Sequence, residues 1–453
     1  MSDVIICGGG VAGSSLAILL GRAGLEVELL EQQRFPRDKT CAEGIFPAGV
    51  GVLQRLGLRD AVGGAPLHGV RHHAWGHVLA ASFSAAPGLP AFGLGQRRLH
   101  LDAVLFAAAR ATPGVTVREG TRVDAPLVHA GRVIGVDAAG EAHRARLVVA
   151  ADGPRSILRR RAGLDGPPDR RPRLGLRAHF RLAAGVRVPE RVEVFFTTGY
   201  ELYLTPLPDG EIVLAALAER AAVAGDPRVW LRACIEQHGE LRELLRGADQ
   251  ISAVAGQGPL SSRTLRGVAP GLVLLGDAAG FVDPVTGTGM AQALLAAELL
   301  AQHLTTSSFD ASDQRLREFD RARTRLLADS VLLTRFVLAL TRHPRLARAS
   351  LHVMRAVPAL YSHMVGVAGG SRTLLPRHAA RAISHRNAAS SRTDVPTSSA
   401  TVQNASDSKR SGARKSARPT TRHTRQPATG APAATAELTS TGKPLQVSSG
   451  KDT

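Results

Sequence analysis

The feature that most constrains this chain is a glycine-rich motif between two short apolar stretches at its N-terminus. Residues 4–7 are apolar, residues 8–13 read Gly-Gly-Gly-Val-Ala-Gly, and residues 11–22 have the pattern of a helix with small side chains. A second apolar stretch, residues 27–30, ends at Glu31. The spacing predicts a β-α-β unit of about 30 residues whose glycines form the turn between the first strand and the helix.

Each glycine of this GxGxxG motif has a physical role when the unit binds a dinucleotide. Gly8 permits the tight turn, Gly10 lets the backbone approach a pyrophosphate, and Gly13 allows the helix to pack closely on the strand. Val11 and Ala12 begin the helix, whose free N–H groups and positive end favour phosphate. Glu31 ends the second strand, where a carboxylate can accept hydrogen bonds from an adenosine ribose.

The rest of the chain alternates between two kinds of pattern. We expect strands at residues 115–123, 132–138, 147–151 and 272–275, an antiparallel group at 191–196, 201–205 and 211–216, and helices at 44–58, 101–110, 230–246, 291–303 and, broken at two prolines, 315–364. We therefore predict a discontinuous nucleotide-binding domain (1–70, 98–165 and 256–310), a substrate-binding sheet domain (71–97 and 166–255), C-terminal helices (311–385) and a tail (386–453).

Charge is unevenly distributed along the chain. The chain carries 57 Lys and Arg against 38 Asp and Glu, a formal net charge of +19. Residues 386–453 hold eleven basic and four acidic residues and no aromatic residue. This composition predicts a disordered, solvated tail, and the lack of interleaved aromatic residues argues against specific nucleic-acid binding.

The N-terminus and the cysteines constrain the compartment. The chain begins directly with the first strand, without a secretory leader, and no run of 18 apolar residues occurs, so we expect a cytoplasmic protein. Three widely spaced cysteines, without a CxxC pair, predict neither a metal site nor a disulfide framework. The helices between residues 321 and 364 carry Arg beside apolar positions. Peripheral membrane contact therefore stays open, although we favour a role as the cap of the fold.

Together with the N-terminal motif, three further patterns resemble one flavoprotein superfamily. They are Arg98-x-x-x-Asp102, the strand end at Ala151-Asp152-Gly153, and residues 271–289, which read GLVLLGDAAGFVDPVTGTG. Taken together they resemble the superfamily that contains the group A flavin monooxygenases, the geranylgeranyl reductases and the flavin halogenases, over roughly residues 1–380. The resemblance implies a Rossmann-like α/β FAD-binding domain of the glutathione-reductase type, with three layers (ββα) and an inserted antiparallel-sheet domain.

The resemblance also implies a cofactor site. Asp277, after Gly276, would accept hydrogen bonds from the ribityl chain of FAD, and residues 287–290 would direct helix N–H groups at the flavin ring. Arg98 would contact the FAD phosphates or ribose, and Asp152 would lie near the cofactor. For Asp102 we favour an exposed helix acid or cap. The expected cofactor-binding residues are Gly8, Gly10, Val11, Ala12, Gly13, Glu31, Arg37, Lys39, Arg98, Asp152, Gly276, Asp277, Gly287, Gly289 and Met290.

Residues 35–44, FPRDKTCAEG, resemble a stretch of the geranylgeranyl-reductase branch that lies beside the flavin. Arg37 and Lys39 are candidate phosphate or cofactor contacts, and Cys41 either faces the flavin or is a buried inert thiol. Tyr203 is the second catalytic candidate, and with Phe196 a candidate wall of the substrate site. Four histidines are candidate acids or bases, although single histidines on strands are more often structural: His72, His73, His77 and His179.

Three functions remain open at this point. The expected activity is an NAD(P)H-dependent monooxygenase that uses O2 to hydroxylate an aromatic or polyketide-like small molecule. The alternatives are a geranylgeranyl-reductase-like enzyme that reduces prenyl double bonds and a non-catalytic flavin-binding protein. Neither the aromatic spacing typical of prenyl reductases near residues 201–206 nor the halogenase WxWxIP motif is present. The oligomeric state is left open.

Overall fold

The first sheet is built on the predicted N-terminal β-α-β unit. In the computed structural model, which describes residues 1–374, its strands follow the order β18-β19-β11-β1-β2-β8. Along this order only β18 and β19 pair antiparallel, and off it a hairpin described below pairs antiparallel with β11. The strands are β1 (Ser2–Cys7), β2 (Val27–Glu31), β8 (Val115–Glu119), β11 (Glu141–Ala150), β18 (Val268–Ala269) and β19 (Leu272–Leu274). Because the other strands are parallel, their carboxyl ends meet at one edge, where ligands of such sheets bind.

Two layers cover this sheet, as the three-layer prediction requires. Helices α1 (Val11–Arg22), α4 (Arg98–Ala111) and α8 (Gly289–Thr305) pack on one face. The hairpin β9 (Val123–His129) and β10 (Arg132–Ala138), with α5 (Ile157–Arg161), packs on the other. Alternation along β1 divides the side chains: Val4 and Ile6 join the helical core, while Ile5 and Cys7 join the core beneath the hairpin.

The second sheet follows the order β16-β12-β15-β14-β13-β5-β6, with β17 paired to β12. Its strands are β5 (Gly69–Ala74), β6 (His77–Ser82), β12 (Arg173–Arg181), β13 (Val192–Phe196), β14 (Tyr200–Pro206), β15 (Glu211–Glu219), β16 (Asp249–Gln250) and β17 (Ala255–Gln257). The pairing is antiparallel, as predicted, except that β5 runs parallel to β13. This early hairpin β5–β6 was not predicted from the sequence.

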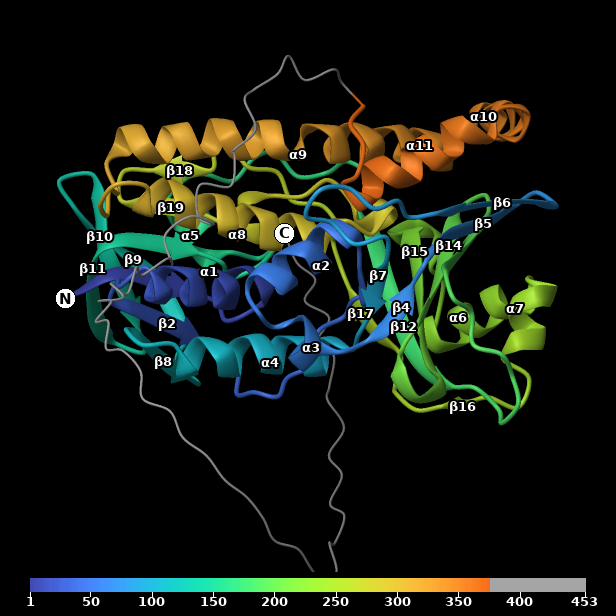
Figure 1. The fold of residues 1–453 in the computed structure, drawn as a ribbon, viewed down its shortest axis with the longest axis horizontal. Helices are drawn as coiled ribbons and strands as arrows, with labels where there is room; N and C mark the ends of the chain where they lie inside the picture. The colour runs from blue at the N-terminus through green and yellow to red at the C-terminus, as the bar shows by residue number, and fades with distance from the viewer. Residues whose placement is uncertain (375–453) are drawn as a thin grey trace, which may run out of the picture. The chain divides into compact units, whose positions relative to one another are not determined.

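One face of the second sheet packs against two short helices (Figure 1). A single helix was predicted over residues 230–246, but the chain forms α6 (Pro227–Glu236) and α7 (Gly239–Leu244). The prediction is wrong because His238 adopts an extended conformation (φ −115°, ψ 100°) between them. Leu231 and Leu241 then pack with Leu202 and Leu214 of the sheet.

The segment between the two sheets also departs from its prediction. A continuous helix was expected over residues 44–58, but residues 44 and 45 instead form β3 (Gly44–Ile45) in a small sheet of order β3-β7-β4. The other elements here are β4 (Ala65–Leu67), β7 (Gly93–Gly95), α2 (Pro47–Arg55) and α3 (Arg59–Val62). Helix α2 begins only at Pro47, a residue suited to the first helical position because it lacks an N–H group.

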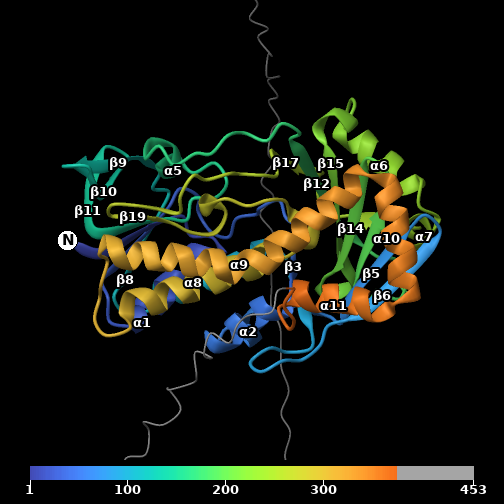
Figure 2. The same cartoon turned by 90° about the horizontal axis from the view of Figure 1, so that it is seen from above.

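Three C-terminal helices cross from one half of the molecule to the other. They are α9 (Asp313–Arg342), α10 (Pro344–Ala356) and α11 (Pro358–Gly369), and they begin anew at Pro344 and Pro358 as predicted. Figure 2 shows α9 running from above α8 toward the second sheet, where α10 and α11 lie. Residues 375–385 and the predicted tail, 386–453, lie outside the described residues.

Candidate functional site

A large cavity opens where the carboxyl edge of the first sheet faces the second sheet and α9. Its volume is about 1440 Å³. Sites for one small ligand usually measure about 300–1,000 Å³. The cavity therefore has room for an extended cofactor and for a second molecule beside it. Its two ends, here called the cofactor end and the apolar end, differ in what lines them.

The cofactor end is formed by the N-termini of two helices. Neither α1, capped by Gly10, nor α8, capped by Thr288, receives a side-chain cap hydrogen bond. Gly10, Val11 and Ala12 of α1, and Gly287, Thr288, Gly289 and Met290 before and in α8, line the cavity. Because the first N–H groups of a helix have no partner within it, both helices present donors and positive potential to one space. Such a pair of helix ends fits an anionic dinucleotide.

Glycine makes this close backbone approach possible. Gly8 has a φ of +107°, and a Cβ atom there would lie 2.4 Å from the carbonyl oxygen of Ala151. At Gly13 a Cβ atom would lie 1.9 Å from the carbonyl oxygen of Gly8. A Cβ atom at Gly289, by contrast, would meet nothing within 4 Å. The first two glycines therefore shape the turn, while Gly289 leaves cavity space free for a ligand.

Glu31 lies beneath the glycine turn, where its carboxylate is held by backbone donors. The N–H groups of Gly9 and Gln33 donate to its two oxygens at 2.8 and 2.9 Å. Arg37 lies 3.9 Å from Glu31 and 2.9 Å from Asp102. Glu31 and Arg37 thus lie next to one another, although neither is among the residues that line the cavity.

Asp102 is not the exposed helix acid that the sequence suggested. Its side chain is fully buried, and both carboxylate oxygens accept hydrogen bonds of 2.7 Å from Arg98. Burial alone would raise the pKa of Asp102, but the charge and hydrogen bonds of Arg98, reinforced by Arg37, hold that pKa below its usual value. The expectation was wrong because Asp102 pairs inside the fold with Arg98 and with Arg37, which is distant in the sequence. Asp102 therefore orients Arg98, which does line the cavity.

Two further predicted residues meet at the same end. Asp277 lies in the short 3-10 helix η3 (Gly276–Ala279), and its carboxylate is 3.7 Å from the ammonium group of Lys39. Both line the cavity. Asp152 does not: its carboxylate accepts the N–H of Ile157 at 2.9 Å and caps the start of α5. Its neighbours Ala151 and Gly153 line the cavity instead.

Cys41 lines the cavity next to a residue that the sequence reading missed. The Cys41 thiol accepts the N–H of Glu43 at 3.3 Å. Glu43 is fully buried and has a φ of +60°, which is unusual for a side chain of this size. Its carboxylate accepts the N–H of Arg98 at 3.0 Å and pairs with His179 at 2.8 Å. Glu43 thus ties the cofactor end to the second sheet. The sequence offered one signal for Glu43: it is an acidic residue directly before Gly44, in the segment 35–44 that resembles the geranylgeranyl-reductase branch.

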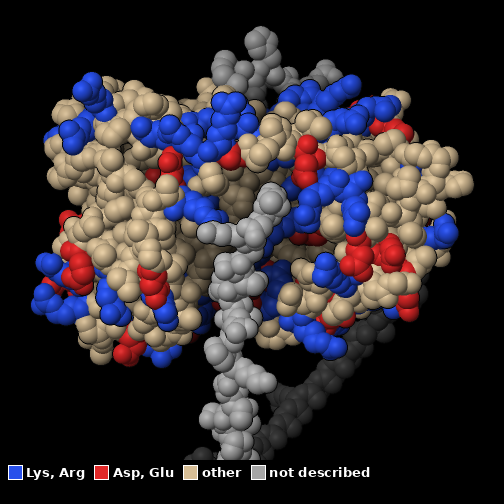
Figure 3. All heavy atoms as spheres, turned by 180° about the vertical axis from the view of Figure 1, so that it is seen from behind, with Lys and Arg blue, Asp and Glu red and all other residues tan. Residues whose placement is uncertain are grey.

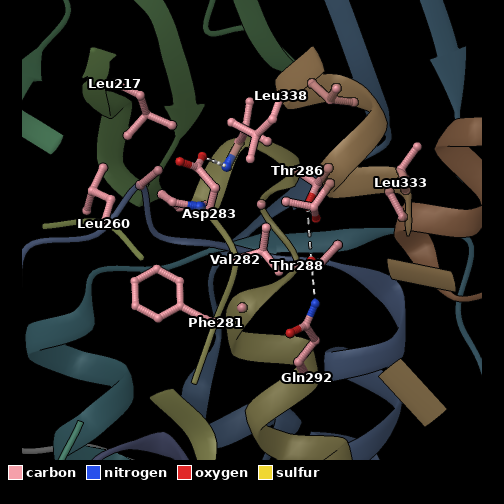
Figure 4. Close-up of a pocket in the computed structure, with 18 of the residues that line it drawn as sticks. Leu217, Leu260, Phe281, Val282, Asp283, Thr286, Thr288, Gln292, Leu333 and Leu338 are labelled. Atoms are coloured by element: carbon pink, nitrogen blue, oxygen red, sulfur yellow. Dashed lines mark hydrogen bonds between the residues drawn. The ribbon is translucent and has the colours of Figure 1, made fainter. Parts of the chain in front are cut away.

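The apolar end is lined by alternate residues of the second sheet and by the inner faces of α9 and α10. From the sheet come Val70, His72, Val192, Val194, Phe196, Tyr203, Ala215 and Leu217. Figure 4 shows Leu217 and Leu260 facing Leu338 across the space, with Phe281 and Val282 nearby. Because strand side chains alternate, the same strands can line a cavity on one face and pack on α6 and α7 with the other.

One charged cluster interrupts this apolar surface. Arg173 pairs with Asp283 at 3.0 Å and with Glu201, and all three side chains are buried. Burial raises the pKa of Glu201 to about 7 and that of Asp283 to about 6, although Arg173 opposes both shifts. Asp283 lines the cavity. The sequence reading singled out none of the three, because nothing in their spacing indicates that they meet.

Tyr203, a catalytic candidate, lies beside this cluster. Its hydroxyl donates to the carbonyl oxygen of Val285 at 3.0 Å, and burial raises its pKa well above the usual value. Tyr203 is therefore neutral near pH 7, and its hydrogen bond holds the loop that leads to Gly287. Phe196, the other predicted wall residue, lines the same end.

A ladder of hydroxyl groups joins α8 to α9 at the boundary between the two ends. Thr286 bonds to Thr334 at 2.8 Å, Thr288 bonds to Ser330 at 3.0 Å, and Gln292 donates to both Thr288 and Ser330 at 2.9 and 2.7 Å. Figure 4 shows Gln292 reaching Thr288. The ladder positions α9 over the N-terminus of α8.

The four candidate histidines lie in different surroundings. His72 lines the cavity and bonds to Tyr361 at 2.6 Å; burial, with a smaller contribution from His73, lowers its pKa to about 4. His179 is buried against Glu43. His73 pairs with Glu193 on the outside of the cavity, and His77 lies near Arg355. Of the four, only His72 lines the cavity.

Comparisons with known proteins agree with this geometry. Residues 1–179 match the family model described as an FAD binding domain. The chain is 30% identical over 330 residues to a menaquinone reductase of Mycobacterium tuberculosis, covering 66% of this chain and 76% of the relative. It is 27% identical to a 6-methylpretetramide 4-monooxygenase of Streptomyces rimosus, covering 83% and 94% of the two chains. The solved myxobacterial chondrochloren halogenase, an FAD-dependent halogenase, superposes with a TM-score of 0.65 at 25% identity, covering 75% and 82%.

Proposed function

The chain belongs to the FAD-dependent superfamily that contains the group A flavin monooxygenases, the geranylgeranyl reductases and the flavin halogenases, and we propose that it reduces a carbon–carbon double bond of a lipophilic substrate with NAD(P)H as reductant. The apolar end of the cavity carries this proposal, because its leucine, valine and phenylalanine walls suit a long apolar molecule. The relationship to a menaquinone reductase supports it.

The cofactor end supplies the groups that FAD requires. The N-terminus of α1 would hold the pyrophosphate and Asp277 with Lys39 the ribityl region, while the N-terminus of α8 would face the flavin ring. Glu31, beneath the glycine turn and outside the cavity lining, stays the predicted partner of the adenosine ribose. FAD, when bound, supplies the two-electron redox chemistry of the enzyme. The N-terminus of α8 would place its N–H groups and positive potential beside the ring.

The apolar end would bind the substrate and exclude water. Leu217, Leu260 and Leu338 offer no hydrogen bonds, so a hydrocarbon chain loses nothing by leaving water there and gains about 25 cal/mol for each Å² of apolar surface buried. Exclusion of water by these side chains would also limit side reactions in the site.

Asp283 would supply the proton that reduction of an alkene needs. Its Oδ1 atom accepts hydrogen bonds from the Arg173 guanidinium and from the N–H of Val285. The other oxygen, Oδ2, is therefore the atom that can hold a proton. Burial favours the protonated form, because it raises the pKa of Asp283 to about 6. In the balanced reaction one carbon receives a hydride that originates from NAD(P)H, the other receives the Asp283 proton, and solvent returns a proton to Asp283.

Oxygen dependence tests this proposal. Purified protein, expected to be yellow, would be given NAD(P)H and candidate prenyl, quinone and polycyclic aromatic substrates with and without O2. We expect a product two mass units heavier that forms in the absence of O2. A product that carries 18O from labelled O2 would contradict reduction.

Hydroxylation is the second candidate function, and the sequence reading placed it first. It is favoured by the match to the Streptomyces rimosus monooxygenase, which extends over more of both chains than the match to the menaquinone reductase. In that reaction O2, NAD(P)H, a proton and the substrate would yield hydroxylated product, NAD(P)⁺ and water. The same labelling experiment distinguishes the two reactions.

A further inference from the structure

We propose that the outer surface of residues 331–374, which comprise the C-terminal part of α9 with α10 and α11, docks this protein on an anionic lipid bilayer. The charge of this segment is the first observation. Residues 331–374 contain six arginines and no aspartate or glutamate. Five of them are exposed, namely Arg335, Arg345, Arg348, Arg355 and Arg372, whereas Arg342 lies 3.8 Å from Glu219 and lines the cavity. Figure 3 shows Lys and Arg gathered along the upper edge of the molecule, where α9 and α10 lie.

Large apolar side chains are exposed on the same three helices. Val353 is 52% exposed and Val357 is 50% exposed, values typical of a surface without a protein layer over it. The exposed apolar residues of this segment are Leu332, Phe336, Leu346, Val353, Val357, Leu360 and Leu374. Apolar and cationic residues thus alternate on one surface, here called the docking surface, which is the pattern of helices that lie in a membrane interface.

The opposite faces of these helices line the cavity. Leu333 and Leu338 of α9, and Leu351 and Met354 of α10, face inward. Each helix therefore has apolar residues on both sides, one set against the cavity and one set outside. A surface helix that only capped the core would need the inner set alone. The arrangement places the apolar end of the cavity directly behind the docking surface.

The hairpin β5–β6 extends this surface. The Arg348 guanidinium lies 5.8 Å from the Trp75 ring, and Arg355 lies 3.3 Å from His77. Next to them, Val78 is 51% exposed. Tryptophan is enriched at the level of lipid headgroups, because its ring is apolar and its N–H is polar.

The charge of the docking surface favours a bilayer over a second copy of the chain as its partner. Two copies meeting through the docking surface would bring only positive side chains together, since residues 331–374 have no acid to pair with. Anionic lipids supply the missing negative charge and attract arginines near the bilayer surface. Within residues 1–374 no helix is long and apolar enough to cross a membrane, so the proposed contact is with the bilayer surface.

Vesicle co-sedimentation of the full-length FAD-loaded protein tests the proposal. We expect binding to vesicles of phosphatidylglycerol and phosphatidylcholine, and weaker binding to phosphatidylcholine alone. The variant Leu346→Glu/Val353→Glu should bind the anionic vesicles at least about 10-fold more weakly, because two apolar side chains that would enter the bilayer are replaced by negative charges that the lipid headgroups repel. The matched control is Val229→Glu/Leu265→Glu, two residues that are 67% and 65% exposed outside the docking surface.

Both double variants keep residues 375–453, so any lipid binding by that basic segment is the same in each. Equal binding by the two double variants, or failure of the wild type to bind anionic vesicles, would overturn the proposal. FAD content and melting temperature, measured for each variant, identify a variant that has not folded. The outcome is independent of whether the enzyme reduces or hydroxylates its substrate.

Discussion

The two ends of the cavity are built by different means. The cofactor end is made largely of backbone: uncapped helix N-termini and glycines whose missing side chains create space. The apolar end is made of side chains that come from the second sheet and from α9 and α10. A site made of backbone needs certain residues at certain spacings, whereas an apolar wall accepts many residues of similar volume. This explains why the superfamily shares a cofactor while its members act on different molecules.

The largest expected effect comes from filling the cofactor end. Gly289→Phe places a ring in space that is open in the fold, so the protein should fold but lose nearly all of its FAD. The measurement is the ratio of flavin to protein absorbance after purification. The matched control is Gly239→Phe, since Gly239 also begins a helix and has no neighbour within 4 Å of its Cβ position, but lies outside the cavity. Full flavin content in Gly289→Phe would show that FAD does not bind at this end.

The next effect concerns the proton at the apolar end. Asp283→Asn keeps the shape but cannot donate a proton, so turnover should fall about 10²-fold or more. Because the pKa of Asp283 is about 6, the wild-type rate should decline as pH rises above that value, and the variant should lack this decline. Rates measured from pH 5 to 9 at constant flavin content test both statements. If Asp283→Asn showed the same dependence of rate on pH as the wild type, Asp283 would not be the proton donor.

A smaller effect is expected from one side chain at the cofactor end. Asp277→Ala removes a carboxylate acceptor, which is worth about 1.5–3 kcal/mol for charged hydrogen bonds, so the dissociation constant for FAD should rise about 10- to 100-fold. Titration of the apoprotein with FAD, followed by flavin fluorescence, gives this value. A variant that binds FAD like the wild type would show that backbone groups suffice at this end.

The last effect is on stability rather than on binding or turnover and concerns the charged cluster at the apolar end. The folded pKa of Glu201, about 7, lies above its usual value of about 4.3, so the folded state binds more protons between these values. Stability contributed by this group is therefore present at low pH and lost as pH rises toward 7, by about 4 kcal/mol at most.

Glu201→Gln should remove this loss, so the free energy of unfolding should fall less between pH 5 and pH 8 than in the wild type. Urea denaturation at the two pH values measures it, and Glu236→Gln, at an exposed helical position, is the control. Equal losses in the wild type and Glu201→Gln would mean that Glu201 is charged throughout this pH range in the folded protein.

The same contrast between backbone and side chains decides what could be predicted from the sequence. Helix α1 occupies residues 11–22 as predicted, and the helix breaks at Pro344 and Pro358 are also confirmed. Glycine and proline act locally, through the conformations that they allow or forbid. The three-layer flavoprotein fold follows from these local signals and from the resemblance that the motifs carry.

The interactions that were missed depend on residues far apart in the chain. Asp102 pairs with the distant Arg37, and the cluster at the apolar end joins Arg173, Glu201 and Asp283 from two strands and a loop. The role of Glu43 is seen only in the folded chain, where its carboxylate pairs with His179 of the second sheet. Periodicity within a segment carries no information about such pairs. The expected cofactor-binding residues remain predictions until a flavin titration is made.

The parallel pairing of β5 with β13 has a consequence for how the protein is made. Strand β5 ends at Ala74 and its partner β13 begins at Val192, 118 residues later. At a synthesis rate of about 5–20 residues per second, roughly 6–24 s pass between the synthesis of β5 and that of β13, and during this time one edge of β5 is unpaired. An open strand edge is a template for pairing with other chains. Yield of this protein should therefore depend on chaperones and on translation speed across residues 75–192 more than its final stability would suggest.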